Sequence, residues 1–212
     1  NGSTSITGNP SSVRFIDGNG GNLTFTTTDF IISGGGLNIL MGGNNLLLPA
    51  TGTPIINITN NFLIDGTSYT AILDASVTTK KLRLNVGNNF TMSNTNANIT
   101  VARSNGPVTV FVNNSFNFNS GKFIGQIDTL NTSIDSVIIG NTFTMNTASS
   151  SDYFRINYGD GNTVFKCTGP FNLQNSGTGM GSGFCGIYRG RGNMSFIALS
   201  SFTLANGRFA GI

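Results

Sequence analysis

The sequence predicts an all-β fold in which a single chain winds as a parallel β-solenoid, with successive coils stacked on one another. Three observations lead to this prediction. Short alternating runs of Val, Ile, Leu, Phe and Thr are separated by clusters of Asn, Gly and Ser, as strands are separated by turns. No stretch keeps the i, i+3, i+4 apolar spacing of a helix. One phrase also recurs every 26 to 32 residues, which is too short for a propeller blade of roughly 40–45 residues.

The recurring phrase is an alternating apolar run, a few small polar residues and a phenylalanine. "LNVGNNFTM", Leu84 to Met92, matches "INITNNFLI", Ile56 to Ile64, position for position. A looser first copy, Leu23 to Ile32, has one extra residue. The copies are anchored by Phe30, Phe62, Phe90, Phe116, Phe143, Phe171 and Phe202. We therefore expect about seven coils of 26–32 residues, forming one repetitive domain over residues 1–212.

Each copy contains three strand-like pieces. The first is the alternating run, the second begins at the anchor phenylalanine, and the third follows a turn of variable length. The third pieces are clearest at Tyr69–Ile72, Ala97–Val101, Phe123–Ile127 and Tyr153–Ile156. Three short strands per repeat fit one solenoid coil. A β-sandwich is the alternative fold, but a sandwich would not repeat its turn chemistry at a constant spacing.

The repeated polar residues have a structural explanation in a solenoid. Equivalent positions of successive coils lie about 4.8 Å apart. We therefore expect Asn60, Asn88, Asn114 and Asn141 to stack in one column at the first turn. Asparagine tolerates the backbone of tight bends, and its amide can both donate and accept hydrogen bonds. A second, inward column of stacked rings is expected for Phe62, Phe90, Phe116, Phe143, Phe171 and Phe202.

The composition excludes several kinds of chemistry. The chain has no His, which rules out His-dependent acid–base catalysis and nucleophilic triads. Charged residues make up 9% of the chain and the net charge is +3, without the dense basic stripe of a nucleic-acid-binding protein. No apolar run approaches the roughly 18–20 residues of a membrane helix. We predict no nucleic-acid partner, no membrane insertion, and neither a cofactor nor a metal site.

Acidic residues give little sign of an active site. The eight aspartates lie at different offsets from their anchor phenylalanines, except that Asp74 and Asp128 share an offset of twelve, two coils apart. That separation, roughly 10 Å, would suit an inverting glycosidase pair, but one coincidence among many pairs is weak support. The loops at Asp17 and Asp160 lack the repeated oxygen ligands of calcium sites and read as tight turns.

The two cysteines, Cys167 and Cys185, fall in the same repeat copy. Neither belongs to a CxxC motif, and the absence of His argues against a zinc site. They form either a disulfide, consistent with an exported protein, or two buried thiols. Both alternatives remain open from the sequence.

Coils of this length, with an asparagine column at one bend and apolar columns inside, resemble the right-handed parallel β-helix superfamily. Pectate lyases, tailspikes and many bacterial surface adhesins share that fold. The phrases "GNNFTM", "NNSFNF" and "GNTFTM" are similar to those of large repetitive surface proteins of Bacteroidota-type bacteria. This resemblance implies export, often by the type IX pathway, and a place at the cell surface or in the extracellular matrix.

We therefore expect a non-catalytic, extracellular structural or adhesive β-solenoid, either an adhesin stalk or a filament-forming subunit. Its expected partners are further copies or adjacent solenoid repeats, and surface glycans. The pattern starts and stops without an evident cap, so we expect a fragment or repeat unit of a longer or self-stacking assembly. The alternative is a carbohydrate-active or carbohydrate-binding β-helix protein, such as a polysaccharide lyase or a module that binds sugars through Tyr and Asn.

Overall fold

The computed structural model describes residues 2–8, 13–16, 24–41, 55–73, 82–93, 98–101, 107–125, 134–147, 152–156, 161–175, 184–187, 192–205 and 208–211. Every regular element in these ranges is a β-strand. In chain order the strands are β1 (Thr4–Ile6), β2 (Val13–Ile16), β3 (Thr24–Thr27), β4 (Phe30–Met41), β5 (Ile55–Ile58), β6 (Phe62–Leu73), β7 (Leu82–Val86), β8 (Phe90–Ser93), β9 (Asn98–Val101), β10 (Val108–Val112), β11 (Phe116–Phe118), β12 (Lys122–Gly125), β13 (Ile134–Ile139), β14 (Phe143–Thr147), β15 (Tyr153–Ile156), β16 (Asn162–Cys167), β17 (Phe171–Asn175), β18 (Phe184–Ile187), β19 (Met194–Ala198), β20 (Phe202–Ala205) and β21 (Arg208–Gly211).

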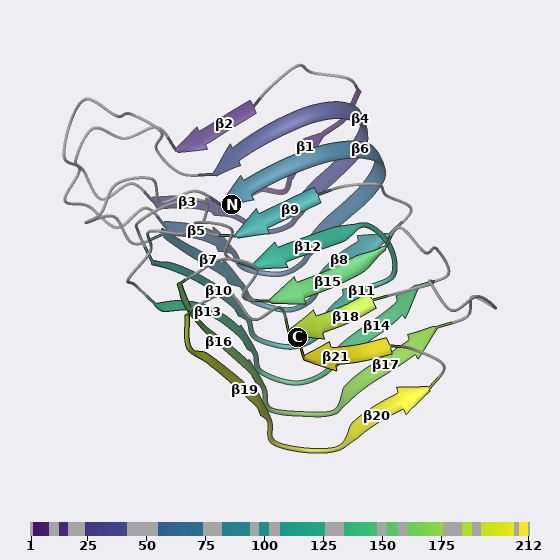
Figure 1. The fold of residues 1–212 in the computed structure, drawn as a ribbon. Helices are drawn as coiled ribbons and strands as arrows, with labels where there is room; N and C mark the ends of the chain where they lie inside the picture. The colour runs from purple at the N-terminus through teal and green to yellow at the C-terminus, as the bar shows by residue number, and fades with distance from the viewer. Residues whose placement is uncertain are drawn as a thin grey trace.

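The strands form two parallel sheets that rise together as the walls of a solenoid (Figure 1). The seven-stranded sheet has the order β19-β16-β13-β10-β7-β5-β3, with one strand from each repeat copy. The fourteen-stranded sheet contains two rows, β20-β17-β14-β11-β8 and β9-β12-β15-β18-β21, joined through β6. Each strand pairs with the equivalent strand of the next coil, for example Phe90 with Phe116 and Val110 with Val137. The predicted all-β parallel solenoid is confirmed.

The first two full copies differ from the expected pattern of three short strands. β4 and β6 each run for 12 residues and supply both the second and the third strand of their coils. Their pairing shifts register at Gly34 and Gly35, which marks an irregularity in the ladder. A glycine-rich bulge lets a strand bend without ending, so one strand turns the corner that a loop makes in later coils.

The coil count and one register also differ from expectation. β1 and β2 pair with the two ends of β4 and so form part of a further coil ahead of the first predicted copy. Within that copy, Phe25 pairs with Ile56 and Phe30 with Phe62. The turn of the first copy is therefore one residue shorter than the others, whereas the sequence alignment placed an extra residue there.

Phenylalanine rings dominate the core. The anchor rings stack between consecutive coils with centroids 5.1 Å apart for Phe30–Phe62, 4.6 Å for Phe62–Phe90, 4.5 Å for Phe90–Phe116, 4.7 Å for Phe143–Phe171 and 5.2 Å for Phe171–Phe202. The stack is interrupted once, because Phe116 and Phe143 meet edge to face at 83°. The ring of Phe154, from β15, lies 4.8 Å from Phe143 and 5.8 Å from Phe116 and fills this level of the core.

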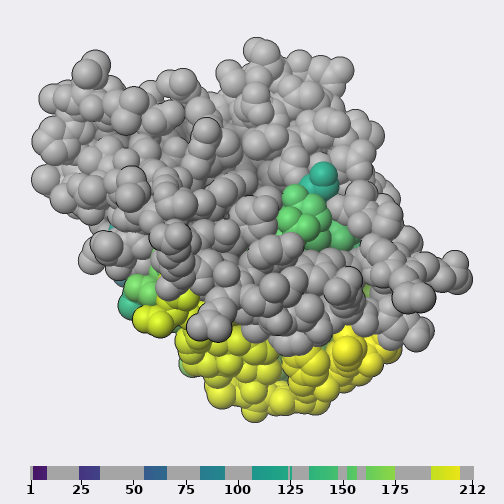
Figure 2. All heavy atoms as spheres, viewed as in Figure 1, coloured from purple at the N-terminus to yellow at the C-terminus, as the bar shows by residue number. Residues whose placement is uncertain are grey.

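The last coil is covered less completely than the others. Phe202 and Leu204 of β20 continue the inward columns of the earlier coils, yet they are 44% and 48% exposed. In Figure 2 residues 192–205, in yellow, form the lower surface of the molecule. The equivalent residues one coil earlier, Phe171 and Leu173, are buried. Apolar positions that stacking covers elsewhere therefore face solvent in β20.

Candidate functional site

The turn after the seven-stranded sheet carries a continuous ladder of side-chain hydrogen bonds. Asn88 donates from Nδ2 to Oδ1 of Asn60 at 3.3 Å, Asn114 to Asn88 at 3.1 Å, and Asn141 to Asn114 at 2.9 Å. Backbone bonds run alongside, such as the N–H of Asn88 to the carbonyl oxygen of Asn60 at 2.8 Å. Every amide donates toward the preceding coil, so the four asparagines form one directed column.

The ladder begins on a carboxylate. Asp29 Oδ1 accepts from Asn60 Nδ2 at 2.9 Å and from the backbone N–H of Asn61 at 3.1 Å. Asp29 thus bonds to both Asn60 and Asn61 of the next coil. Because one carboxylate satisfies two residues, the turn that contains Asp29 can be one residue shorter. The Asn61 backbone N–H, followed by the Ser3 hydroxyl, holds the pKa of Asp29 below its usual 3.8.

The ladder ends at Gly169, which occupies the asparagine position one coil after Asn141. Its N–H donates to the carbonyl oxygen of Asn141 at 2.7 Å. A Cβ at this position would lie 2.7 Å from Asn141 Oδ1 and 2.8 Å from its carbonyl oxygen, closer than packing allows. The side-chain column therefore extends from Asp29 to Asn141.

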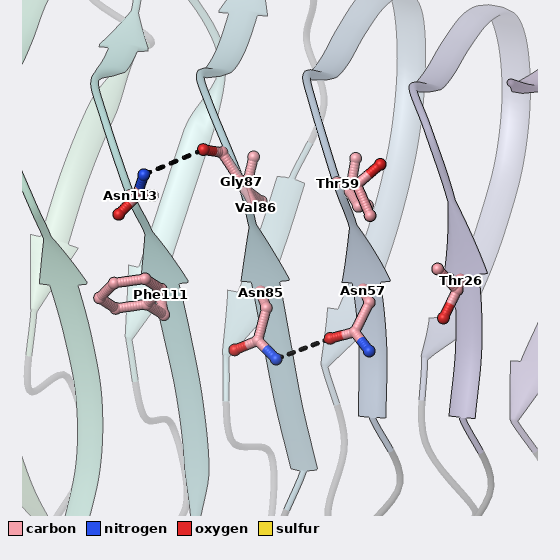
Figure 3. Close-up of a pocket in the computed structure, with 9 residues that line it drawn as sticks. Thr26, Asn57, Thr59, Asn85, Val86, Gly87, Phe111 and Asn113 are labelled. Atoms are coloured by element: carbon pink, nitrogen blue, oxygen red, sulfur yellow. Dashed lines mark hydrogen bonds between the residues drawn. The ribbon is translucent and has the colours of Figure 1, made fainter. Parts of the chain in front are cut away.

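A shallow groove of about 430 Å³ lies on the outer face of the seven-stranded sheet, beside this turn (Figure 3). Its floor is a row of outward residues that lie in register on β3, β5, β7 and β10, namely Thr26, Asn57, Asn85 and Phe111. Strand alternation produces the row, because the residues on either side of each point into the core. The rim is formed by Thr59, Gly87 and Asn113 at the turn.

The polar groups of the groove are held by one another. Asn85 donates from Nδ2 to Oδ1 of Asn57 at 2.8 Å, and Asn113 donates from Nδ2 to the carbonyl oxygen of Gly87 at 3.2 Å. A Cβ at Gly87 would overlap the carbonyl oxygen of Thr59, so close stacking of the coils requires glycine there. The lining offers amides, hydroxyls and one aromatic ring, with no ionisable side chain. Such a set can bind a neutral polar molecule through hydrogen bonds.

Two of the aspartates that the structure describes lie inside the solenoid. Asp135 is 1% exposed, and its Oδ1 accepts the N–H of Val108 at 2.8 Å. Burial raises the pKa of Asp135 from 3.8 to about 7, and the Val108 hydrogen bond opposes this shift. Asp152 is 4% exposed and accepts the N–H of Gly121 at 2.8 Å. Each carboxyl group therefore binds the backbone of the preceding coil.

Cys167 is a free, buried thiol, so the structure does not contain the Cys167–Cys185 disulfide that the sequence left open. Its Sγ lies at the turn, 3.2 Å from the carbonyl oxygen of Asn141 and 3.5 Å from that of Gly169. Burial raises the pKa of this thiol. The side chain of Cys185 lies outside the described residues.

Four aspartates considered from the sequence lie outside the described ranges: Asp17, Asp74, Asp128 and Asp160. The same holds for Tyr158 and Tyr188, two of the four tyrosines that a sugar-binding module could use. Tyr153 is described, and the guanidinium carbon of Arg155 lies 4.0 Å from the centroid of its ring. Among the described residues there is no group of three or more His, Cys, Asp or Glu side chains that could hold a metal ion. The described part of the chain also lacks any helix with the length and hydropathy of a transmembrane span.

The fold and the turn ladder define the chain as a parallel β-solenoid with polar and aromatic columns running between its coils. Comparison with protein-family models, with curated proteins and with solved structures found no match.

Proposed function

We propose that this chain is a non-catalytic structural or adhesive β-solenoid of the cell surface or extracellular matrix, serving as a rigid stalk or as a filament subunit. The observation that carries the proposal is the continuity of the intercoil contacts. The amide ladder joins the turns from Asp29 to Asn141. In the interior, rings stack from Phe30 to Phe116 and again from Phe143 to Phe202, and an edge-to-face contact between Phe116 and Phe143 links the two stacks. Repeated contacts of this kind stiffen a solenoid along its axis.

The exposed apolar positions of β20 are a second argument. Phe202 and Leu204 continue columns that are buried wherever another coil covers them. A further parallel coil stacked on β20, from the same chain or from another molecule, would bury these side chains as β20 covers Phe171 and Leu173 of the coil before it. The similarity of the repeat phrases to Bacteroidota-type surface proteins supports an exported location.

Negative-stain electron microscopy of the purified chain over a range of concentrations tests the proposal. Fibres of uniform width would identify a filament subunit, and Leu204→Lys, which places a charge on the exposed edge, should then shorten them. Isolated short particles at every concentration would identify a stalk segment. Release of reducing ends or of unsaturated products from a polysaccharide panel would contradict the non-catalytic proposal.

A further inference from the structure

We infer that the outer groove of the seven-stranded sheet is a binding site for a neutral glycan chain lying along the solenoid axis. This inference rests on the proposed adhesive function and assigns the ligand class for it. The groove crosses four consecutive coils, because Thr26, Asn57, Asn85 and Phe111 lie on four neighbouring strands. Its volume of about 430 Å³ falls within the roughly 300–1,000 Å³ of ligand pockets.

The amide groups are set in fixed orientations. Because Asn85 Nδ2 is bound to Asn57 Oδ1, the remaining polar atoms of the pair are a donor, Asn57 Nδ2, and an acceptor, Asn85 Oδ1. Figure 3 shows Asn57 Nδ2 on the side of Thr26 and Asn85 Oδ1 on the side of Phe111. A ligand therefore meets one donor and one acceptor whose orientations are already fixed, which reduces the entropy cost of binding.

Phe111 supplies the apolar part of the site. It is half-buried on the outer face, in the row where the two preceding coils carry asparagine. A large aromatic ring beside paired amides suits a molecule that has hydroxyl groups on its rim and C–H groups on its face. Sugar rings have this combination, and simple polar solutes do not.

The charge of the lining selects between glycan classes. The residues that line the groove are uncharged, so the lining offers no counterion to a carboxylate or sulfate. Arg83 lies on the same face of β7, two residues before Asn85, and is exposed to solvent outside the lining. A neutral glycan therefore fits the groove better than an acidic one.

The coil structure also explains why the groove is open. The rim residue between Thr59 and Asn113 is Gly87, and a side chain there would overlap the carbonyl oxygen of Thr59. The same close packing that stacks the turns thus keeps this position of the rim without a side chain.

The test is a titration of the isotope-labelled chain with cellohexaose, maltohexaose and mannohexaose, following the side-chain amide signals of Asn57 and Asn85 by NMR. Hexagalacturonate is the acidic comparison. We expect at least one neutral hexasaccharide to shift these signals. Asn85→Ala and Phe111→Ala should each weaken its affinity about two- to tenfold, the effect of one hydrogen bond or one ring contact.

Asn117→Ala is the matched control, because Asn117 is an outward asparagine on β11 in the other sheet. Its affinity should equal that of the unchanged chain, and Phe111→Tyr should retain binding because it keeps the ring. No shift of the groove signals with any neutral sugar would overturn the inference. Binding of hexagalacturonate alone, or equal losses for Asn85→Ala and Asn117→Ala, would also overturn it.

The two proposals fail in different ways. Fibres or short particles without sugar binding would remove the groove assignment and leave the structural function standing. Sugar binding at the groove followed by cleavage of the sugar would keep the site and overturn the non-catalytic function.

Discussion

Replacing Asp135 with asparagine should remove a large pH dependence of stability. Asp135 is 1% exposed, and its pKa is raised from 3.8 to about 7 in the folded chain. The folded state therefore retains a proton that the unfolded state releases above pH 3.8. The free energy of unfolding is greatest below the unfolded pKa and falls as pH rises through the folded pKa, because charging a buried carboxyl group is costly.

The magnitude follows from the shift. A change of about three pKa units corresponds to roughly 4 kcal/mol, at 1.36 kcal/mol per unit. Asp135→Asn stays neutral, and its amide oxygen can accept the same N–H from Val108. We expect this variant and the unchanged chain to be similarly stable near pH 4. Near pH 8 the variant should be more stable by about 2–4 kcal/mol.

Urea unfolding followed by far-UV circular dichroism between pH 4 and pH 9 measures the difference. Asp29→Asn is the control, because hydrogen bonds lower the pKa of Asp29 and place its titration below this window. The pH profile of that control should parallel the profile of the unchanged chain. Parallel profiles for Asp135→Asn and the unchanged chain between pH 4 and pH 8 would refute the reasoning.

Three further predictions concern the columns and the thiol. Asn88→Ala removes two ladder bonds and should lower the free energy of unfolding by about 1–3 kcal/mol in urea titrations, while Asn117→Ala, outside the ladder, should cost less than half as much. Phe154→Ala should lower the free energy of unfolding by about 3–5 kcal/mol, because it opens a cavity among buried rings. Phe202→Ala, at a 44% exposed site, should lower it by less than about 1.5 kcal/mol. Equal losses for the two variants would contradict the described core. Iodoacetamide should alkylate Cys167 only after the chain unfolds, because the thiol is buried and its pKa is raised. Peptide mass spectrometry measures the labelling, and rapid labelling of the folded chain would show that the thiol is accessible.

The regular part of the fold was predictable because it depends on alternation and on a repeated phrase. The position of Phe90 relative to Phe116 follows directly from aligning two copies, and the structure pairs them. The first copy was misaligned. The sequence alignment placed an extra residue before Phe30, whereas the structure pairs Phe25 with Ile56 and makes this turn one residue shorter than the others. Only the hydrogen bonds of Asp29 show that one carboxylate can span the positions of two amides.

Other features depend on contacts that a repeat alignment does not reveal. The alternation of β13 places Asp135 inside, because it lies two residues before the inward Val137, although a carboxyl group is rarely buried. The bend within β4 needs the register shifts at Gly34 and Gly35. The sequence did not reveal the groove, because its floor residues are of different types. Asn57 and Phe111 belong to one row only because both point outward at equivalent positions of their strands.

The carboxylate at the start of the ladder has a consequence for the whole column. A carboxylate can only accept, so Asn60 must turn its NH₂ group toward Asp29 and its oxygen toward Asn88. The same choice is then imposed on each amide in turn as far as Asn141. One charged residue thus sets the polarity of a chain of aligned dipoles, and the solenoid has an electrical direction along its axis as well as a chain direction.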